Sequence, residues 1–430
     1  MQHDDNEPQD DAQSTASPRG SLSASRRGFL GAGLFAGGAL VGGTVGRATA
    51  SDDEPAPKSD VVEFYGAHQA GVTTAAQDRL MFATLDVTTS DKTELMHLLG
   101  RWSAMASRFT QGKQVAERDD NPAVPPKDTG ETMDMPAENL TITVGFGASL
   151  FDERFGLADR MPAALAPFGP LPGSAAMDPQ ISDGDLCIQA CADDPQVVFH
   201  AVRNMVRAAR GVAVLRWSQL GFGRASATGA GQSTPRNLFG FKDGTRNIHA
   251  DDKTAVSDHV WVGSETDQPW MDGGTYLVAR KIRMEIETWD ADFLADQEKI
   301  FGRKKADGAP LTGGGEFTDV DFAAKKDGEL VVDANSHIAL SAPETNNGIK
   351  ILRRGYNYTD GMHAGTGKLD AGLFFIAFQK DPHKQFVVLQ TRLGKSDLMN
   401  EYITHIGGGT WACPPGLSKP GDWYGKKLFT

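Results

Sequence analysis

Cysteine is scarce in this chain, which has 3 cysteines in 430 residues. Small secreted domains held together by disulfides need many paired cysteines, so that class of protein is excluded. Cys187 and Cys191 would lie on one face of a strand-like run, about 13 Å apart, which is too far for a disulfide bond. Cys413 has no evident partner, and none of the three shows the spacing of a zinc site. We therefore expect buried, inert thiols.

Long apolar runs and an excess of positive charge are also missing. After residue 50, no segment has the roughly 20 apolar residues that span a bilayer, so we expect no membrane span in the mature protein. The 43 basic residues are outnumbered by 56 acidic ones, and the formal net charge is -13. This balance argues against nucleic acid, and against an anionic membrane surface, as a partner.

The N-terminal segment has the pattern of an export signal. Arg26 and Arg27 precede a mildly apolar run, residues 28–46, and Ala48-Thr49-Ala50 follows it. These features are typical of a Tat signal peptide, here residues 1–50. A membrane anchor is the alternative, because the run approaches the length of a span, but its glycines and the A-x-A ending favour cleavage. We therefore expect a flexible linker over residues 51–60 and a periplasmic or extracellular protein.

Strand and helix patterns alternate through the first half of the mature chain. Apolar alternation predicts strands over residues 79–87, 140–146, 185–192 and 213–220, and helical periodicity predicts helices over 91–109 and 194–210. With a short helix before the third strand, the order is strand, helix, strand, short helix, strand, helix, strand. This order predicts an α+β, ferredoxin-like sheet covered by helices.

The second half repeats part of this pattern. The recurring residues are Leu186, Ala190, Asp194, Pro195 and Phe199, which return at a constant offset as Leu373, Ala377, Asp381, Pro382 and Phe386. In each copy an Asp-Pro pair stands where a helix can begin, so coincidence of common helix-start signals is the alternative. We interpret the pattern as a duplication. The second copy would have strands at 275–286 and 373–380 and a helix at 290–301.

The duplication predicts two ferredoxin-like domains with antiparallel sheets, residues 61–234 and 235–430. Two related layers that face each other would enclose a crevice. Because ligands favour such junctions, we expect the cofactor to bind between the domains.

An acid, an imidazole and a guanidinium stand near glycines in the second half. Asp243 lies within the segment 240–247 (Gly-Phe-Lys-Asp-Gly-Thr-Arg-Asn), and His337 and Arg353 follow far downstream. An imidazole can be the axial ligand of haem iron, and a carboxylate can move a proton between the oxygens of peroxide. A guanidinium stays charged and can stabilise the departing hydroxide. Singly, each residue has a structural alternative: a turn for Asp243, a hydrogen-bonded histidine for His337 and a surface ion pair for Arg353.

Several segments of the chain resemble one known family. They are residues 65–69 (Tyr-Gly-Ala-His-Gln), 185–194, 240–247, His337 and 351–356. With these motifs the mature chain resembles the dye-decolorising peroxidases, and within them the Tat-exported, iron-transport-associated (deferrochelatase/peroxidase) branch.

The resemblance implies bound haem b and a role for each residue of the group. His337 would be the proximal iron ligand, and Asp243 and Arg353 would be the distal catalytic pair. Arg354 matches the family pattern less well than Arg353. Whether Asp243 or Arg353 dominates catalysis is left open.

Three further residues are candidates for binding the cofactor. Arg246 and Asn247 follow Asp243 directly, and haem propionates need cationic or amide partners. Phe375 lies in a strand whose side chains alternate, so it could line the distal pocket, with core packing as the alternative.

A histidine that binds a metal usually donates its other ring nitrogen to a carboxylate or carbonyl. Asp397 and Glu401 stand one helical turn apart in a helix-like run over residues 396–406 and are candidates for that partner. A solvated helix face is the alternative.

The predicted function is a haem peroxidase. Hydrogen peroxide would be one substrate, and a dye, phenol or metal ion would supply electrons in two one-electron steps. The iron-transport branch adds iron release from haem, and proteins of an iron-uptake system as partners. A haem carrier without turnover is a third possibility, although storage needs no distal acid and cation.

Overall fold

The computed structural model describes residues 60–116, 121–229 and 231–430. The predicted signal peptide, residues 1–50, lies outside the described residues, and so does the predicted linker, 51–60, except for Asp60. Within the described ranges, no helix combines the length and the apolar content needed to cross a membrane.

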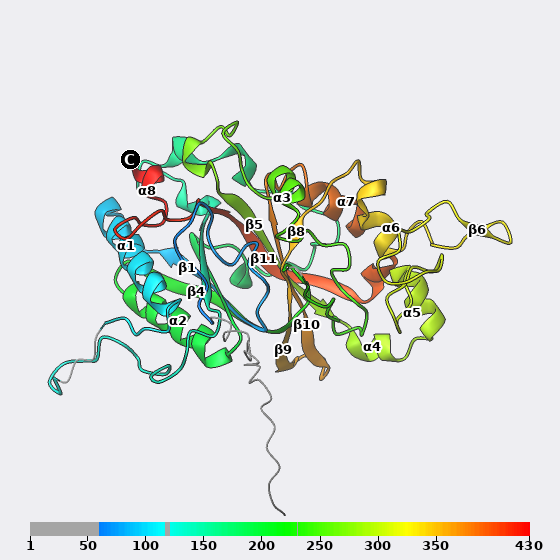
Figure 1. Cartoon of the computed structure of the whole chain (residues 1–430), viewed down its shortest axis with the longest axis horizontal. Helices are drawn as coiled ribbons and strands as arrows, with labels where there is room; N and C mark the ends of the chain where they lie inside the picture. The colour runs from blue at the N-terminus through cyan, green and yellow to red at the C-terminus, as the bar shows by residue number, and fades with distance from the viewer. Residues whose placement is uncertain (1–59, 117–120, 230) are drawn as a thin grey trace, which may run out of the picture. The chain divides into compact units, whose positions relative to one another are not determined.

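Eleven strands are present in the described part of the chain (Figure 1). They are β1 (Arg79–Val87), β2 (Thr141–Gly147), β3 (Leu186–Ala192), β4 (Ala213–Arg224), β5 (Thr275–Met284), β6 (Lys325–Lys326), β7 (Glu329–Leu330), β8 (Leu352–Arg353), β9 (Tyr356–Met362), β10 (Leu369–Gln379) and β11 (Ile403–Cys413). β6 and β7 form a separate small hairpin, and the others share one sheet.

The large sheet closes on itself. Its order is β5-β11-β2-β3-β1-β4-β9-β10-β8, and an additional pairing joins β5 to β10. Eight strands therefore form a ring, with β8 beside β10, and the pairings between them are antiparallel. The predicted α+β class with antiparallel strands is confirmed. However, the strands of the two halves do not form two facing layers, because β4 pairs with β9 and β11 pairs with β2.

Eight α-helices accompany the strands in the described residues. They are α1 (Lys92–Phe109), α2 (Pro195–Ala208), α3 (Lys253–His259), α4 (Ile286–Asp290), α5 (Leu294–Phe301), α6 (His337–Ser341), α7 (Phe386–Ser396) and α8 (Lys426–Phe429). The two longest helices begin where the sequence predicts. Asp91 caps α1 by accepting from the Thr93 amide, and Asp194 caps α2 by accepting from the Gln196 amide.

The two halves of the chain have related topologies. In the first half, β1, α1, β2, β3, α2 and β4 follow one another, and the strands lie in the order β2-β3-β1-β4. In the second half, the corresponding elements are β5, α4 with α5, β9, β10, α7 and β11, and the strands lie in the order β9-β10-β5-β11. The repeated sequence pattern therefore falls on β3 with α2 and on β10 with α7.

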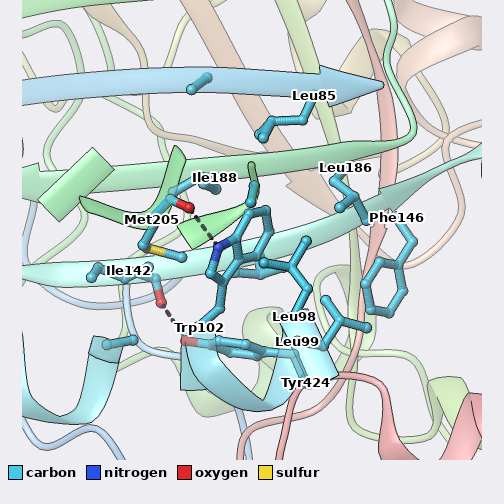
Figure 2. Packing of buried hydrophobic residues seen from close by; sticks show 14 of the residues in the cluster. Leu85, Leu98, Leu99, Trp102, Ile142, Phe146, Leu186, Ile188, Met205 and Tyr424 are labelled. Carbon is cyan, nitrogen blue, oxygen red and sulfur yellow. Dashed lines mark hydrogen bonds between the residues drawn. The ribbon is translucent and has the colours of Figure 1, made fainter. Parts of the chain in front are cut away.

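One hydrophobic core joins α1 and α2 to the first-half strands (Figure 2). Trp102 of α1 is completely buried, and its Nε1 donates to the Met205 carbonyl of α2 over 2.8 Å. Leu85, Ile142 and Leu186 from three different strands belong to the same cluster. A fully buried apolar side chain of this kind contributes about 1.5–3 kcal/mol, so the core holds the helices firmly on the sheet.

A second core fills the inside of the ring. It takes side chains from most of the ring strands, including Phe82, Trp217 and Trp411. All three cysteines are buried and free, and Cys187 and Cys191 lie in this cluster as predicted. Side chains of this core therefore occupy the inside of the ring.

The predicted helix-like run over residues 396–406 is wrong. α7 ends at Ser396, and Asp397 caps a single turn of 3₁₀ helix, Leu398–Glu401. The chain then becomes β11 from Ile403, paired along its length with β5. This segment forms a strand instead of the predicted helix because β11 completes the ring with backbone hydrogen bonds to distant segments.

Candidate active site

A cavity lies against the outer face of the second-half strands. Ile282 and Met284 of β5 and Leu373 of β10 line it, while their neighbours Ala279 and Phe374 belong to the core inside the ring. α6, α7 and the loop around Asp243 supply other lining residues. The expected position of the site at the domain junction is wrong, since all lining residues fall within 237–405. The two halves join edge to edge in one ring, and this cavity lies against the strands of the second half.

His337 begins α6 and lines this cavity. Its Nδ1 is 2.7 Å from Oδ2 of Asp397, and 33% of its side-chain surface is accessible. In the described residues no hydrogen bond uses Nε2, so that nitrogen remains available to a ligand. Burial opposes the charged ring, but the Asp397 carboxylate outweighs it and raises the pKa of His337.

Asp397 has the geometry to orient the His337 ring. Its side chain is 2% exposed, and its Oδ1 accepts from the Met399 amide over 2.9 Å. A carboxylate fixed in this way favours the ring tautomer with hydrogen on Nδ1 and its lone pair on Nε2. Of the two candidates from the sequence, the structure brings Asp397 to the cavity, while Glu401 is exposed and does not line it.

Asp243 and Arg353 meet at the cavity although they are 110 residues apart in the chain. Nη1 of Arg353 lies 2.5 Å from Oδ1 of Asp243, and the two side chains are 28% and 13% exposed. The second carboxylate oxygen of Asp243 accepts from Nδ2 of Asn237 over 3.3 Å. Asp243 raises and Arg353 lowers the pKa of His337, so the three groups act on each other through one cavity.

The position after Asp243 requires a glycine for steric reasons. Gly244 has a φ of +90°, and a Cβ there would come 3.1 Å from the Ser226 Cα atom. A side chain would therefore be strained and crowded at this position. The glycine lets the backbone turn sharply beside the carboxylate.

The neighbouring residue Arg354 does not reach the cavity. It is completely buried and donates to Thr228 Oγ1, to the Thr74 carbonyl and to Gln77 Oε1. Successive side chains of a strand point to opposite faces, so Arg353 faces the cavity and Arg354 faces away. Of the two arginines, the structure thus places the preferred one in the site.

Asn247, which the sequence predicts to bind the cofactor, makes its contacts with the protein backbone in this structure. Asn247 does not line the cavity. Its Nδ2 donates to the carbonyls of Ala227 and Arg353, and its Oδ1 accepts from the Arg353 amide over 2.8 Å. Both polar atoms of the amide are therefore used, and they hold the backbone of Arg353.

Arg246 and Phe375 do line the cavity. Arg246 already has carboxylate partners, since its Nη2 lies 2.5 Å from Glu344 and 3.7 Å from Asp319. The Phe375 ring lies 6.1 Å from the ring of Phe386, which begins α7. Phe375 is thus part of the apolar wall, and Arg246 stands at a polar edge.

Asn237 and His405 are cavity residues that sequence reasoning missed. Asn237 precedes Asp243 by six positions and lies outside the glycine motif. His405 shows no partner spacing in the sequence, since it reaches the cavity through the pairing of β11 with β5. No local pattern could have found either residue.

These residues fit a haem. The apolar walls suit a porphyrin, the accessible imidazole suits its iron, and the acid with its guanidinium suits bound peroxide. An imidazole and an acid–guanidinium pair in one apolar cavity define a site of the haem peroxidase class.

Comparisons with known proteins agree with this class. Residues 69–223 match the family model "Dyp-type peroxidase, N-terminal", and residues 234–418 match "Dyp-type peroxidase, C-terminal". A deferrochelatase of Escherichia coli K12 is 37% identical over 380 residues, which are 87% of this chain and 89% of that protein. The chain therefore belongs to the Dyp-type peroxidase family, and it is an enzyme of that type.

Solved structures extend the comparison. DtpA from Streptomyces lividans, solved as an oxyferrous complex, has 37% sequence identity and a TM-score of 0.79, covering 86% of this chain and 98% of that chain. A DypB variant of Rhodococcus jostii in complex with heme has 22% identity and a TM-score of 0.59, covering 84% of this chain and 97% of that chain, and shows the fold alone. Together with the family match, the DtpA structure confirms the predicted family and haem as the cofactor of this peroxidase class.

Proposed function

We propose that this cavity binds haem b and that the protein reduces hydrogen peroxide with electrons from a dye, phenol or metal ion. The observation that carries the proposal is the accessible Nε2 of His337, with Nδ1 held by Asp397, in the same cavity as Asp243 and Arg353. His337 would hold the iron through Nε2. When bound, haem supplies the redox centre that accepts oxidising equivalents from peroxide.

The residues of the chain would manage the protons and charges of that reaction. Asp243 would accept a proton from one peroxide oxygen at a carboxylate oxygen and return it to the other. Arg353 would stabilise the negative charge that develops on the departing oxygen. Because the two side chains pair with each other, each would also set the position of the other.

We also infer that each half is a ferredoxin-like unit and that the two units arose by duplication. The equivalent strand orders of the halves support this origin. In this fold the haem would lie within the C-terminal half.

Iron release from haem is the second candidate function. It is supported by the name deferrochelatase of the E. coli relative, which matches 87% of this chain. A protein with that activity would work beside an iron-uptake system. Iron release leaves an intact porphyrin without metal, whereas peroxidase turnover leaves the haem in place. Porphyrin fluorescence after incubation with haem and a reductant distinguishes them, and its absence would exclude this function. A carrier without turnover is disfavoured because it has no need for the Asp243–Arg353 pair.

Export by the Tat route to the periplasm or the cell exterior completes the proposal. The support is the sequence pattern of Arg26 and Arg27, the apolar run and Ala48-Thr49-Ala50. Replacing both arginines by lysine should leave the protein inside the cell at its uncleaved size. Export of that variant at the wild-type level would contradict the Tat route.

An optical spectrum tests the main proposal. Purified protein with haem should give a Soret band, which should change after one equivalent of peroxide. His337→Ala should lose or strongly shift that band. Asp243→Ala and Arg353→Ala should keep the band but respond to peroxide more slowly. A wild-type protein that binds no haem, even after reconstitution, would overturn the proposal.

A further inference from the structure

Two buried polar side chains, Arg280 and His405, have unsatisfied nitrogen atoms beside the cavity. The Arg280 guanidinium lies 5.1 Å from the ring centre of Phe386, which lines the cavity. Arg280 of β5 is 6% exposed, and its Nη1 donates only to the carbonyl of Ala279, while Nε has no partner in the described chain. His405 of β11 is 7% exposed and lines the cavity. Within the described residues, no hydrogen bond satisfies its ring nitrogens, and Nδ1 is buried. Buried polar groups are nearly always paired, and because these two lie beside the cavity, a group bound there could supply the missing partners.

Arg280 and His405 are neighbours on the same face of the sheet. His405 is paired with Ile282, and Ile282 and Arg280 point to the same side of β5. Burial and the charge of Arg280 lower the pKa of His405 to about 4, so its ring is neutral near pH 7. Burial lowers the pKa of Arg280 to about 10, and it remains a cation there. The pair therefore offers one positive charge and one neutral imidazole.

Three of the cations that line the cavity already have carboxylate partners. Arg353 is paired with Asp243, Arg246 with Glu344, and Lys242 with Glu316. Arg280 has an attraction to Asp183, but no ion pair joins it to a carboxylate in the described residues. A buried charge without a counterion is costly, so an anion at this position would be strongly favoured.

We propose that Arg280 and His405 bind a carboxylate of the haem, so that one propionate lies at the β5–β11 end of the cavity. This inference rests on the proposed function, because it assumes that haem is bound. Arg280 donates to the carboxylate as a charged group, and His405 donates from one ring nitrogen as a neutral one. This assignment replaces Arg246, whose charge Glu344 already balances, as the main partner of that propionate.

A binding comparison with haem and its dimethyl ester tests the proposal. Esterification removes the negative charge of both propionates and leaves the porphyrin and iron unchanged. Affinities come from absorption titrations of apoprotein, and dissociation rates from transfer to an excess of a haem-binding acceptor. Arg280→Met should weaken haem binding about tenfold or more, because hydrogen bonds to charged groups are strong. The same substitution should change binding of the ester little.

Matched variants make the comparison specific. Arg246→Met removes a cavity cation that is already paired, and its effect should be nearly the same for haem and ester. Lys350 lines the cavity, is half-buried and has no ion pair to another described residue, so Lys350→Met tests a rival position. If Arg280→Met lost haem and ester affinity equally, or if Lys350→Met alone distinguished them, the inference would be overturned.

Folding and the proposed function are controlled separately. If the melting curve shows that Arg280→Met does not fold, His405→Leu provides the same comparison of haem with its ester. The loss of haem affinity should be smaller than for Arg280→Met, because His405 is neutral and Arg280 is charged. A wild-type protein that binds neither haem nor ester contradicts the proposed function. Wild-type binding of both with equal affinity contradicts only the carboxylate site.

Discussion

Nδ1 of His337 lies 2.7 Å from Oδ2 of Asp397, which is 60 residues further along the chain. The contact joins the first residue of α6 to the turn after α7. Because Asp397 is almost completely buried, its carboxylate has few competing water molecules. The His337 ring is therefore held in one tautomer and one orientation toward the cavity.

Removing the Asp397 charge should weaken the hold of His337 on iron. Asp397→Asn should lower haem affinity or peroxidase activity about 10–100-fold, as expected when the partner of a metal-binding histidine is lost. It should also raise the reduction potential of the haem iron, because the imidazole donates less charge. A spectroelectrochemical titration measures the potential. Glu401→Gln is the control, since Glu401 does not line the cavity; equal potentials for both variants would contradict the role of Asp397.

The Asp243–Arg353 pair should behave as one unit in the peroxide step. Asp243→Asn and Arg353→Met should each slow the reaction with peroxide, by about 10²–10⁴-fold for loss of the proton-transfer group. The double variant should be less impaired than the product of the two single effects, since each substitution already breaks the pair. Stopped-flow absorption gives the rate constants. The slower single variant identifies the dominant residue, and multiplicative effects would show independent action.

Asn247 should affect the reaction without affecting haem binding. Asn247→Ala removes the hydrogen bonds that hold the backbone of Arg353. Each of these hydrogen bonds contributes about 1 kcal/mol to holding Arg353 in place, so we expect the peroxide step to slow roughly tenfold. Arg246→Ala is the adjacent control, because Arg246 lines the cavity, its side chain donates to Glu344, and it has no hydrogen bond to Arg353 within the described residues. Weaker haem binding by Asn247→Ala at an unchanged peroxide rate would contradict the assignment.

Acid should destabilise the protein partly through Asp128. Burial by itself would raise the pKa of Asp128, but hydrogen bonds from the Val115 and Gly130 amides and from His200 outweigh it and lower the pKa. The unfolded chain, with an ordinary pKa of about 3.9, then binds the proton more readily than the folded one. The stabilisation is present above about pH 3.9 and is lost as pH falls through the lower pKa of the folded state.

Urea unfolding between pH 3 and pH 7 checks this pH dependence. Asp128→Asn should lower the free energy of unfolding near neutral pH by about 1–3 kcal/mol, since it leaves buried donors poorly satisfied. The difference from wild type should shrink as the pH approaches the acid end of the range. Asp258→Asn, at an exposed position of α3, should follow the wild-type curve. A constant difference at all pH values would show that the charge of Asp128 is not responsible.

Local patterns in the sequence predicted several elements of the fold correctly. The alternation over residues 79–87 coincides with β1, and Asp91 and Asp194 cap α1 and α2 as their positions predict. These features depend on residues close together in the chain, where period and capping chemistry decide the structure. The run over 396–406 shows the limit, because pairing with β5 turned its second part into a strand.

For the site too, some features follow from the sequence and others only from the tertiary structure. By itself the sequence determined which residue types were available, namely Asp243, His337 and Arg353, and the alternation that separates Arg353 from Arg354. Only the tertiary structure decided that Asp397 is the partner of His337, that Asn247 holds Arg353, and that the cavity lies in the C-terminal half. The reason is physical: these contacts join segments that are far apart in the chain, and they exist only after the closed ring has brought the segments together.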